Sequence, residues 1–197
     1  MNKQKRKVEK EDLIQAEIYA KDRKKYRSEL LKYKKNRRVP LGPHASFYFE
    51  NFETMLGQIQ EMLHIEKGGD EQLKDELNAY NPLIPKGNEL VATLMFEIGD
   101  IILRQKFLNT VGGIEKNVYI QIEKEKIIAD PEKDVDRTSE EGKASSVQFL
   151  HFVFTSEQIS KFKNLEKEVE IAIEHPKYNY KTKITKETRE ALIRDFA

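Results

Sequence analysis

Two prolines that bracket a Leu-Gly pair, Pro40 and Pro43, place a rigid bend in this 197-residue chain. A proline cannot continue a helix, because it lacks the backbone N–H and its ring clashes with the preceding turn. Any helix before the bend must therefore end there, and Arg37 and Arg38 supply the cations that a helix C-terminus favours. We interpret the bend first as a joint between a helix and a strand. His44 follows it directly and is a candidate for chemistry, because a rigid joint would fix the direction of its ring.

The segment before the bend has the spacing of one helix face. Its apolar positions recur in steps of three and four, interrupted only by Arg23, and predict a helix from about residue 10 to 36. At about 1.5 Å per residue such a helix would be about 40 Å long. The apolar positions are Leu13, Ala16, Tyr19, Ala20, Tyr26, Leu30 and Tyr33.

After the bend, strand patterns alternate with short helices. Helices are expected at 53–66, 70–79, 100–113, 156–165 and 185–197, and strands at 45–50, 89–98, 118–130 (a hairpin about Lys124-Glu125), 146–154, 169–175 and 178–184. Short connections between strands favour antiparallel pairing. The sequence therefore predicts an α+β fold, in which a mainly antiparallel sheet is covered by helices and preceded by a long N-terminal amphipathic helix.

The length fits one domain over residues 1–197. Residues 1–9 lack an apolar pattern and are expected to be disordered, and 10–38 form a basic helical arm. Residues 130–145 are acidic, lack apolar periodicity and are expected to be a mobile loop.

The net charge of +1 conceals an asymmetry between the arm and the rest. Residues 1–38 hold 15 Lys/Arg and 6 Asp/Glu, a net of +9, so the remainder carries −8. The apolar stripe favours an arm that packs on its own acidic body, in this subunit or in a neighbour, which also allows a homodimer. The alternative is an arm that binds nucleic acid or an acidic partner.

Composition removes several classes of function. The chain has no cysteine, so it has no disulfide, no thiolate nucleophile and no cysteine-ligated iron-sulfur cluster. No run approaches the roughly 20 apolar residues that cross a bilayer. The basic N-terminus is not followed by an apolar signal-peptide segment. We expect a cytoplasmic protein without a membrane role.

The histidines do not form a recognisable metal signature. Glu61 and His64 make one E-x-x-H step, half of a di-iron carboxylate site, but no second step is present. No metal is predicted, and His44, Glu61 and His64 are only weak candidates. His151 lies within a strand and is interpreted as a hydrogen-bonded core histidine, whereas His175 precedes a proline at a turn and is interpreted as structural. No cofactor is indicated.

Several phrases carry a family resemblance over about residues 8–196. They are "RRVPLGPH", "ENFETMLGQIQEML", "DELNAYNPLIP", "ATLMFEIGD", "SSVQFLHF" and "EHPKY". Together they resemble a bacterial family of unknown function, number three thousand five hundred and one. The resemblance implies gene neighbours of the rubrerythrin-like and iron-sulfur oxidoreductase types, and these are the partners it suggests.

The resemblance also implies a set of pattern positions but no catalytic residues. Those positions are Arg38, Pro40, Gly42, His44, Glu53, Gln58, Gln60, Glu61, Asn81 and Pro82. His64, Gln148 and His151 depart from the pattern, which weakens a metal role for the E-x-x-H step and for His151. The candidate ligand or interaction site is Arg38, His44, Glu53, Gln58, Glu61 and Asn81.

Three functions compete on this basis. We favour a non-enzymatic accessory or interaction protein of a redox or oxidative-stress system, because no catalytic signature is present. The alternative is a small-molecule or metal-dependent enzyme with a site around His44 and Glu61, which requires His44, Glu53, Gln58 and Glu61 to converge. A second alternative is nucleic-acid binding through the basic helix, which the regular packing stripe disfavours.

Overall fold

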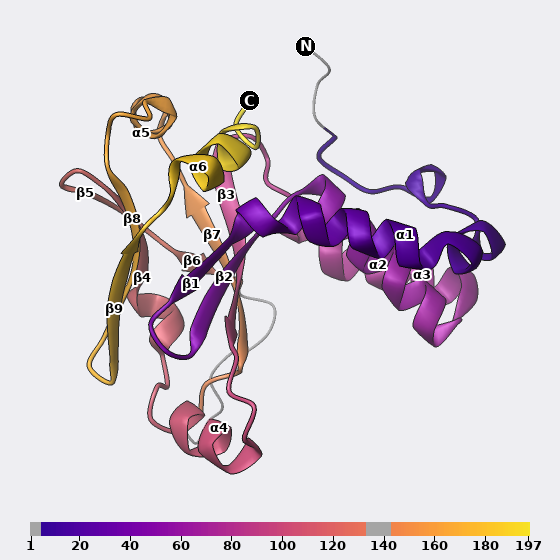
Figure 1. Ribbon diagram of the computed structural model, residues 1–197, viewed down its shortest axis with the longest axis horizontal. Helices are drawn as coiled ribbons and strands as arrows, with labels where there is room; N and C mark the ends of the chain where they lie inside the picture. Colours follow the sequence, from indigo (N-terminus) through magenta and orange to yellow (C-terminus); the bar gives the residue numbers. More distant parts are fainter. Residues whose placement is uncertain (1–4, 133–142) are drawn as a thin grey trace.

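Two antiparallel sheets and a projecting group of helices make up the protein (Figure 1). The computed structural model describes residues 5–132 and 143–197. The three helices form what we call the helical arm: α1 (Ala16–Lys34), α2 (Phe52–Glu66) and α3 (Gly69–Tyr80). The predicted α+β class is confirmed. None of the helices in the described ranges is both long enough and apolar enough to span a membrane.

The first sheet begins directly at the bend. Its strand order is β1-β2-β3-β7-β6, with every neighbouring pair antiparallel. The strands are β1 (Arg38–Leu41), β2 (Ala45–Glu50), β3 (Glu89–Phe96), β7 (Val147–Val153) and β6 (Asp130–Pro131). Pro40 and Leu41 therefore lie in β1, residues 42–44 form a tight turn to β2, and the helix ends before β1 in a 3-10 turn, Lys35–Arg37.

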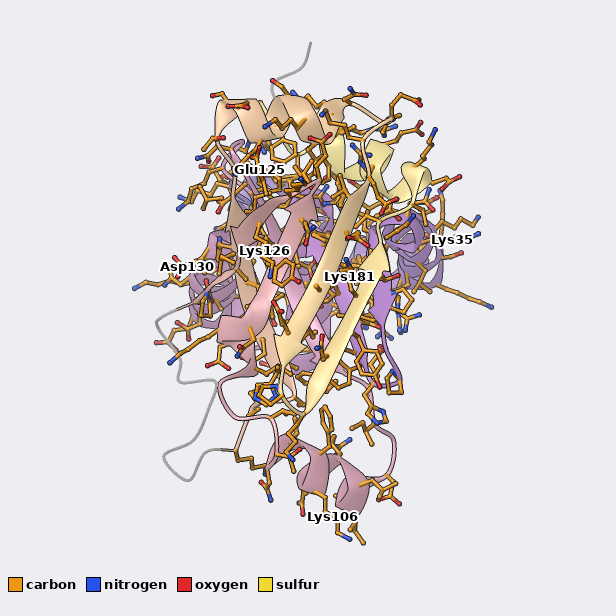
Figure 2. The ribbon with its side chains drawn as sticks, turned by 90° about the vertical axis from the view of Figure 1, so that its left-hand side faces the viewer. Lys35, Lys106, Glu125, Lys126, Asp130 and Lys181 are labelled. Carbon is orange, nitrogen blue, oxygen red and sulfur yellow. The ribbon has the colours of Figure 1, made fainter. Side chains whose placement is uncertain are left out.

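The second sheet packs against the first. Its order is β5-β4-β8-β9, again antiparallel throughout. The strands are β4 (Val118–Ile122), β5 (Glu125–Ile128), β8 (Val169–His175) and β9 (Tyr178–Lys183). Its outward face is charged: Figure 2 shows Lys126 and Lys181 on it, and they pair with Glu174 at 2.7 Å and Glu170 at 2.9 Å.

The main core lies between the two sheets because alternate residues of each strand point inward. Leu90, Ala92, Leu94 and Phe96 of β3 are buried there, as are Ile120 and Ile122 of β4. A smaller apolar cluster lies on the other face of the first sheet. It joins Val91 of that sheet to Met55, Ile59, Leu73, Leu83, Ile84 and Val8. The single predicted sheet is thus two sheets, with the base of the helical arm attached to the outside of one.

Short helices close the ends of the sheets. They are α4 (Ile101–Leu108), α5 (Ser156–Lys163) and α6 (Lys186–Ile193). Each begins at a residue whose side chain accepts a backbone N–H: Asp100, Thr155 and Thr185. In Figure 1, α4 lies at the opposite end of the sheets from α5 and α6.

The N-terminal segment corrects two expectations. Residues 5–9 are ordered, since Val8 is fully buried, donates its N–H to Asn81 Oδ1 at 2.7 Å and accepts from Asn81 Nδ2 at 3.1 Å. The first helix begins at Ala16 rather than near residue 10. The residues just before Ala16 do not continue the helix, because the side-chain amide of Gln60 accepts the N–H of Ile14 at 2.8 Å and donates to its carbonyl at 3.1 Å. These two backbone groups are therefore not available for helix hydrogen bonds.

The predicted acidic loop is also narrower than expected. Residues 130 and 131 pair with β7 as strand β6, and Ala144 is buried and donates its N–H to the carbonyl of Leu108 at 3.0 Å. Residues 1–4 and 133–142, where the remaining expectations of disorder and mobility fall, lie outside the described residues.

Candidate interaction surface

The bend is held from outside by one tyrosine. Tyr178 of β9 places its hydroxyl against the turn, where it donates to the carbonyl of Leu41 at 2.6 Å and accepts the N–H of His44 at 3.1 Å and of Ala45 at 3.0 Å. Gly42 has a φ of +63°, the left-handed region that suits glycine. The bend is therefore also a joint between the two sheets, which the sequence did not indicate.

His44 belongs to an aromatic cluster under α4. Its ring meets Phe107 edge to face at 5.2 Å between centroids and lies 6.4 Å from Tyr178. Phe107 in turn contacts Phe96 at 5.2 Å and Tyr178 at 5.5 Å. Such pairs contribute about 0.5–1.5 kcal/mol beyond their buried area. The histidine thus helps to seat α4 on the end of the sheets.

The outward side of α4 is apolar and open to solvent. Ile101, Ile102 and Leu103 are 61%, 64% and 59% exposed. We call these three residues the α4 tip. Asp100 fixes the start of the helix by accepting the N–H of Leu103 at 2.8 Å, while Leu108 at the other end is buried. Figure 2 shows Lys106 at the extreme end of the molecule, so α4 projects beyond both sheets.

Near this tip, Glu97 makes hydrogen bonds to four other residues. It accepts from Tyr48 at 2.5 Å, from Ser46 at 2.7 Å and from Arg38 at 2.8 Å, and its backbone N–H donates to the carbonyl of His44 at 2.7 Å. Partial burial disfavours the charged carboxylate, but the three side-chain hydrogen bonds outweigh it and lower the pKa of Glu97. Two of the predicted site residues therefore contact Glu97, Arg38 through its side chain and His44 through its backbone carbonyl.

The other four predicted residues lie on the helical arm or at its end. Glu61 accepts from Tyr19 at 2.5 Å and from Arg23 at 2.8 and 3.0 Å, and the hydrogen bonds from Arg23 lower its pKa to about 2 despite partial burial. Asn81 holds the N-terminal segment at Val8, as described above.

Glu53 and Gln58 make weaker contacts within the arm. Tyr33 donates its hydroxyl to Glu53 at 3.3 Å, and Gln58 donates to the hydroxyl of Tyr80 at 3.4 Å. The structure thus divides the predicted site into a group at the end of the sheets and a group on the arm. Among the described residues, no hydrogen bond, ion pair or ring contact joins His44 to Glu61.

Metal binding has no visible framework in the described ranges. These residues contain no group of three or more His, Asp or Glu side chains that could hold an ion. His64 lies beside the ring of Tyr19 at 5.7 Å between centroids. His151 is hydrogen-bonded, as predicted, with Nδ1 at 3.0 Å from Glu89, and His175 Nδ1 accepts the N–H of Lys177 at 3.2 Å.

The sequence did not predict two features of this surface, namely the contact of Tyr178 with the bend and the exposed α4 tip. The sequence predicts only that Tyr178 lies in a strand. Its neighbouring residues give no sign that its side chain reaches a turn more than 130 residues away. The α4 tip did leave a signal. Three consecutive aliphatic residues follow an Asp cap, and a helix face cannot bury three adjacent positions at once, because they span about 200° of its circumference.

The fold and this surface define a class: a two-sheet α+β protein with a helical arm and an exposed apolar helix tip. The chain belongs to the family described as "Protein of unknown function (DUF3501)", whose model matches residues 7–196. It is also similar to a crystal structure described as a novel protein of unknown function from Burkholderia pseudomallei. That chain shares 32% sequence identity and a TM-score of 0.89, over 96% of this chain and 99% of the other. No curated protein matches the chain.

Proposed function

We propose that this protein is a non-enzymatic interaction protein that docks a protein partner on the α4 tip. The observation that carries the proposal is the exposure of three adjacent aliphatic side chains, Ile101, Ile102 and Leu103, each about three fifths exposed. Scattered exposed apolar residues are ordinary on a protein surface, but contiguous ones mark interaction sites. Burial of such side chains contributes roughly 25 cal/mol per Å² of apolar area.

The surroundings of the tip suit a protein interface. Specific interfaces have an apolar centre and a polar rim. Here the rim is supplied by Arg104 and Lys106 on α4 itself, and by the Arg38–Glu97 pair at its base. The aromatic cluster at His44 and Phe107 holds the helix in place before a partner arrives. A preformed surface reduces the entropy lost on binding.

The partner we propose is a protein of a redox or oxidative-stress system in the cytoplasm. The support is the gene neighbourhood implied by the family resemblance, with its rubrerythrin-like and iron-sulfur oxidoreductase proteins. The chain has no cysteine, so it would not itself ligate a cluster through thiolates. Its role would be to hold or position a protein that does.

An enzyme built on His44 and Glu61 receives no support from a specific contact. His44 is committed to an aromatic cluster, and Glu61 is committed to Tyr19 and Arg23 of α1. A catalytic pair would have to lie within reach of one substrate. We therefore do not carry this alternative further.

The test is affinity capture at low salt with the full chain and two matched variants. Ile102→Asn removes one exposed aliphatic side chain from the tip, and Leu31→Asn removes one, 69% exposed, from α1. We expect the wild-type chain and Leu31→Asn to retain the same rubrerythrin-like or iron-sulfur protein, and Ile102→Asn to lose it by tenfold or more.

The captured protein should then be purified and titrated against all three chains by calorimetry. Equal affinity for the wild type and Ile102→Asn would contradict docking on the α4 tip. Absence of any redox protein from the capture, repeated with the purified neighbours, would contradict the proposed partner class.

A further inference from the structure

A cavity lies at the helical arm, away from the α4 tip. It has a volume of about 640 Å³ and is enclosed by the segment before α1, the start of α1, and the turn between α2 and α3. Small-molecule sites in proteins typically have about 300–1,000 Å³. Its walls are mainly aliphatic, contributed by Leu13, Ile14, Ala20, Leu63 and Leu73.

The walls are fixed by hydrogen bonds before any ligand binds. Gln60 holds Ile14 through both its N–H and its carbonyl, so the extended segment cannot collapse into the space. Tyr19, on the opposite wall, is anchored through its hydroxyl to Glu61 at 2.5 Å. A preformed apolar cavity of this kind is the usual design of a ligand site.

Half of the polar residues on the lining have partners. Lys10 pairs with Asp70 at 2.7 Å, Gln60 is used by Ile14, and the hydroxyl of Tyr19 is used by Glu61. The side chains of Gln15, Glu17, His64 and Lys67 make no hydrogen bond or ion pair with another described residue, and His64 and Lys67 are the two of these that can present a basic nitrogen as a donor to an anion.

These two side chains form a donor pair. Both side chains line the cavity: His64 comes from the last turn of α2, and Lys67 is the residue that ends this helix, with a left-handed backbone at φ 56°. Lys67 offers an ammonium group, and a neutral imidazole offers one N–H. Glu17, at the exposed start of α1, is the opposing charge on the lining and lies on a different element. An apolar chamber with an ammonium and an imidazole donor at one side matches an acid with an apolar body.

We propose that this cavity binds a small organic acid, with its hydrocarbon or aromatic body among the aliphatic walls and its carboxylate on Lys67 and His64. The site is independent of the proposed docking surface. The bound molecule would contact the segment before α1, α1 itself and α2 at once.

Calorimetry with decanoate on the full chain, below its micelle concentration, tests the proposal. Decylamine and 1-decanol serve as probes with the same tail and a different head. Lys67→Asn removes the ammonium group while suiting the left-handed backbone there, φ 56°. Its matched control is Lys163→Asn at the end of α5. Ala20→Trp fills the cavity, and Ala79→Trp places the same bulk on α3 outside it.

We expect decanoate to bind at least tenfold more tightly than decylamine. Lys67→Asn should weaken decanoate about 3- to 10-fold and leave 1-decanol unchanged. Ala20→Trp should abolish binding of both, and the two control variants should bind as the wild type does. Equal affinity for the three head groups would overturn recognition of an acid. Unchanged binding in Ala20→Trp, or no binding of decanoate at all, would overturn the site.

Discussion

At the scale of single residues, the hydroxyl of Tyr178 on β9 makes three hydrogen bonds to the backbone of the bend and its first following residues. One oxygen serves the Leu41 carbonyl and two N–H groups of the turn, and all of these are enclosed between the sheets. Backbone groups that lose a buried partner cost more than an average hydrogen bond contributes, because they stay desolvated. The seat of α4 depends on this turn, since His44 rests on Phe107.

Tyr178→Phe should therefore lower the free energy of unfolding by about 1–3 kcal/mol. The ring contacts remain, so the loss isolates the hydroxyl. Urea denaturation followed by circular dichroism measures it. Tyr180→Phe is the control, because that side chain is 42% exposed and its hydroxyl makes no hydrogen bond with another described residue. A loss of similar size in both variants would show that the hydroxyl of Tyr178 does not hold the bend.

Gly42→Ala should be destabilising by about 2–4 kcal/mol, from left-handed backbone and steric overlap together. An added Cβ would lie 2.7 Å from Cγ of Tyr180 and 2.8 Å from Oη of Tyr178. Gly99→Ala is the matched change, because a Cβ there meets nothing within 4 Å. Thermal unfolding of both variants checks the difference, and equal melting temperatures would contradict it.

At the scale of elements, α1 is joined to α2 mainly through charge and tyrosine contacts. Tyr19 is the one residue of α1 that is fully buried, and Tyr26 stacks on it at 5.6 Å. Arg23 and Tyr19 converge on Glu61. Of the predicted apolar stripe, Tyr19 is buried and Tyr26 packs against it. Within this chain, the basic helix α1 thus contacts an acidic side chain of α2.

The attachment of α1 should weaken in acid. The hydrogen bonds from Arg23 and the hydroxyl of Tyr19 lower the folded-state pKa of Glu61 to about 2, below the value of about 4.3 expected in the unfolded chain. The stabilisation is thus complete above pH 4.3 and is lost as the pH falls toward 2. Allowing for solvent screening, it amounts to about 1–2 kcal/mol.

Glu61→Gln should lose that stabilisation at neutral pH and show a flatter dependence of stability on pH between about 4.3 and 2. Denaturant unfolding at several pH values measures it. Glu71→Gln, at an exposed position on α3, is the control and should keep the wild-type slope. An unchanged slope in Glu61→Gln would show that this carboxylate does not fasten α1.

At the scale of the whole molecule, Arg37 connects the arm, the first sheet and the C-terminus. Its guanidinium forms a buried ion pair with Asp195 and donates to the carbonyls of Phe49 at 2.9 Å, Glu50 at 3.2 Å and Ala191 at 3.3 Å. Both charged groups are almost fully buried. The site reading chose Arg38, but the neighbouring arginine is the one that ties the fold together.

Removing one member of this pair should destabilise the entire protein. Asp195→Asn leaves the buried guanidinium without its counter-charge, which costs about 3–5 kcal/mol. Lys126→Gln, which breaks an exposed pair with Glu174, should cost less than about 1 kcal/mol.

Hydrogen exchange in Asp195→Asn should accelerate in β2 and α6 together, since Arg37 joins them. Acceleration confined to α6 would mean that the pair fastens only the C-terminus.

The local features were readable from the sequence because their causes are local. The first helix ends before the prolines, Thr185 caps the last helix, and short turns join β4 to β5 and β8 to β9. The candidate site was less readable. Asn81 was a candidate site residue, yet its amide holds the N-terminal segment at Val8, which lies far away in sequence.

The sequence by itself determined the α+β class, most of the helix and strand positions and the antiparallel hairpins, since propensity, capping and turn chemistry act over a few residues. Only the tertiary structure decided that the strands form two sheets and that β3 pairs with β7. It also decided that Arg37 rather than Arg38 is buried and that His44 supports α4. Those outcomes depend on contacts between distant segments, which become favourable only when the whole chain closes around its cores.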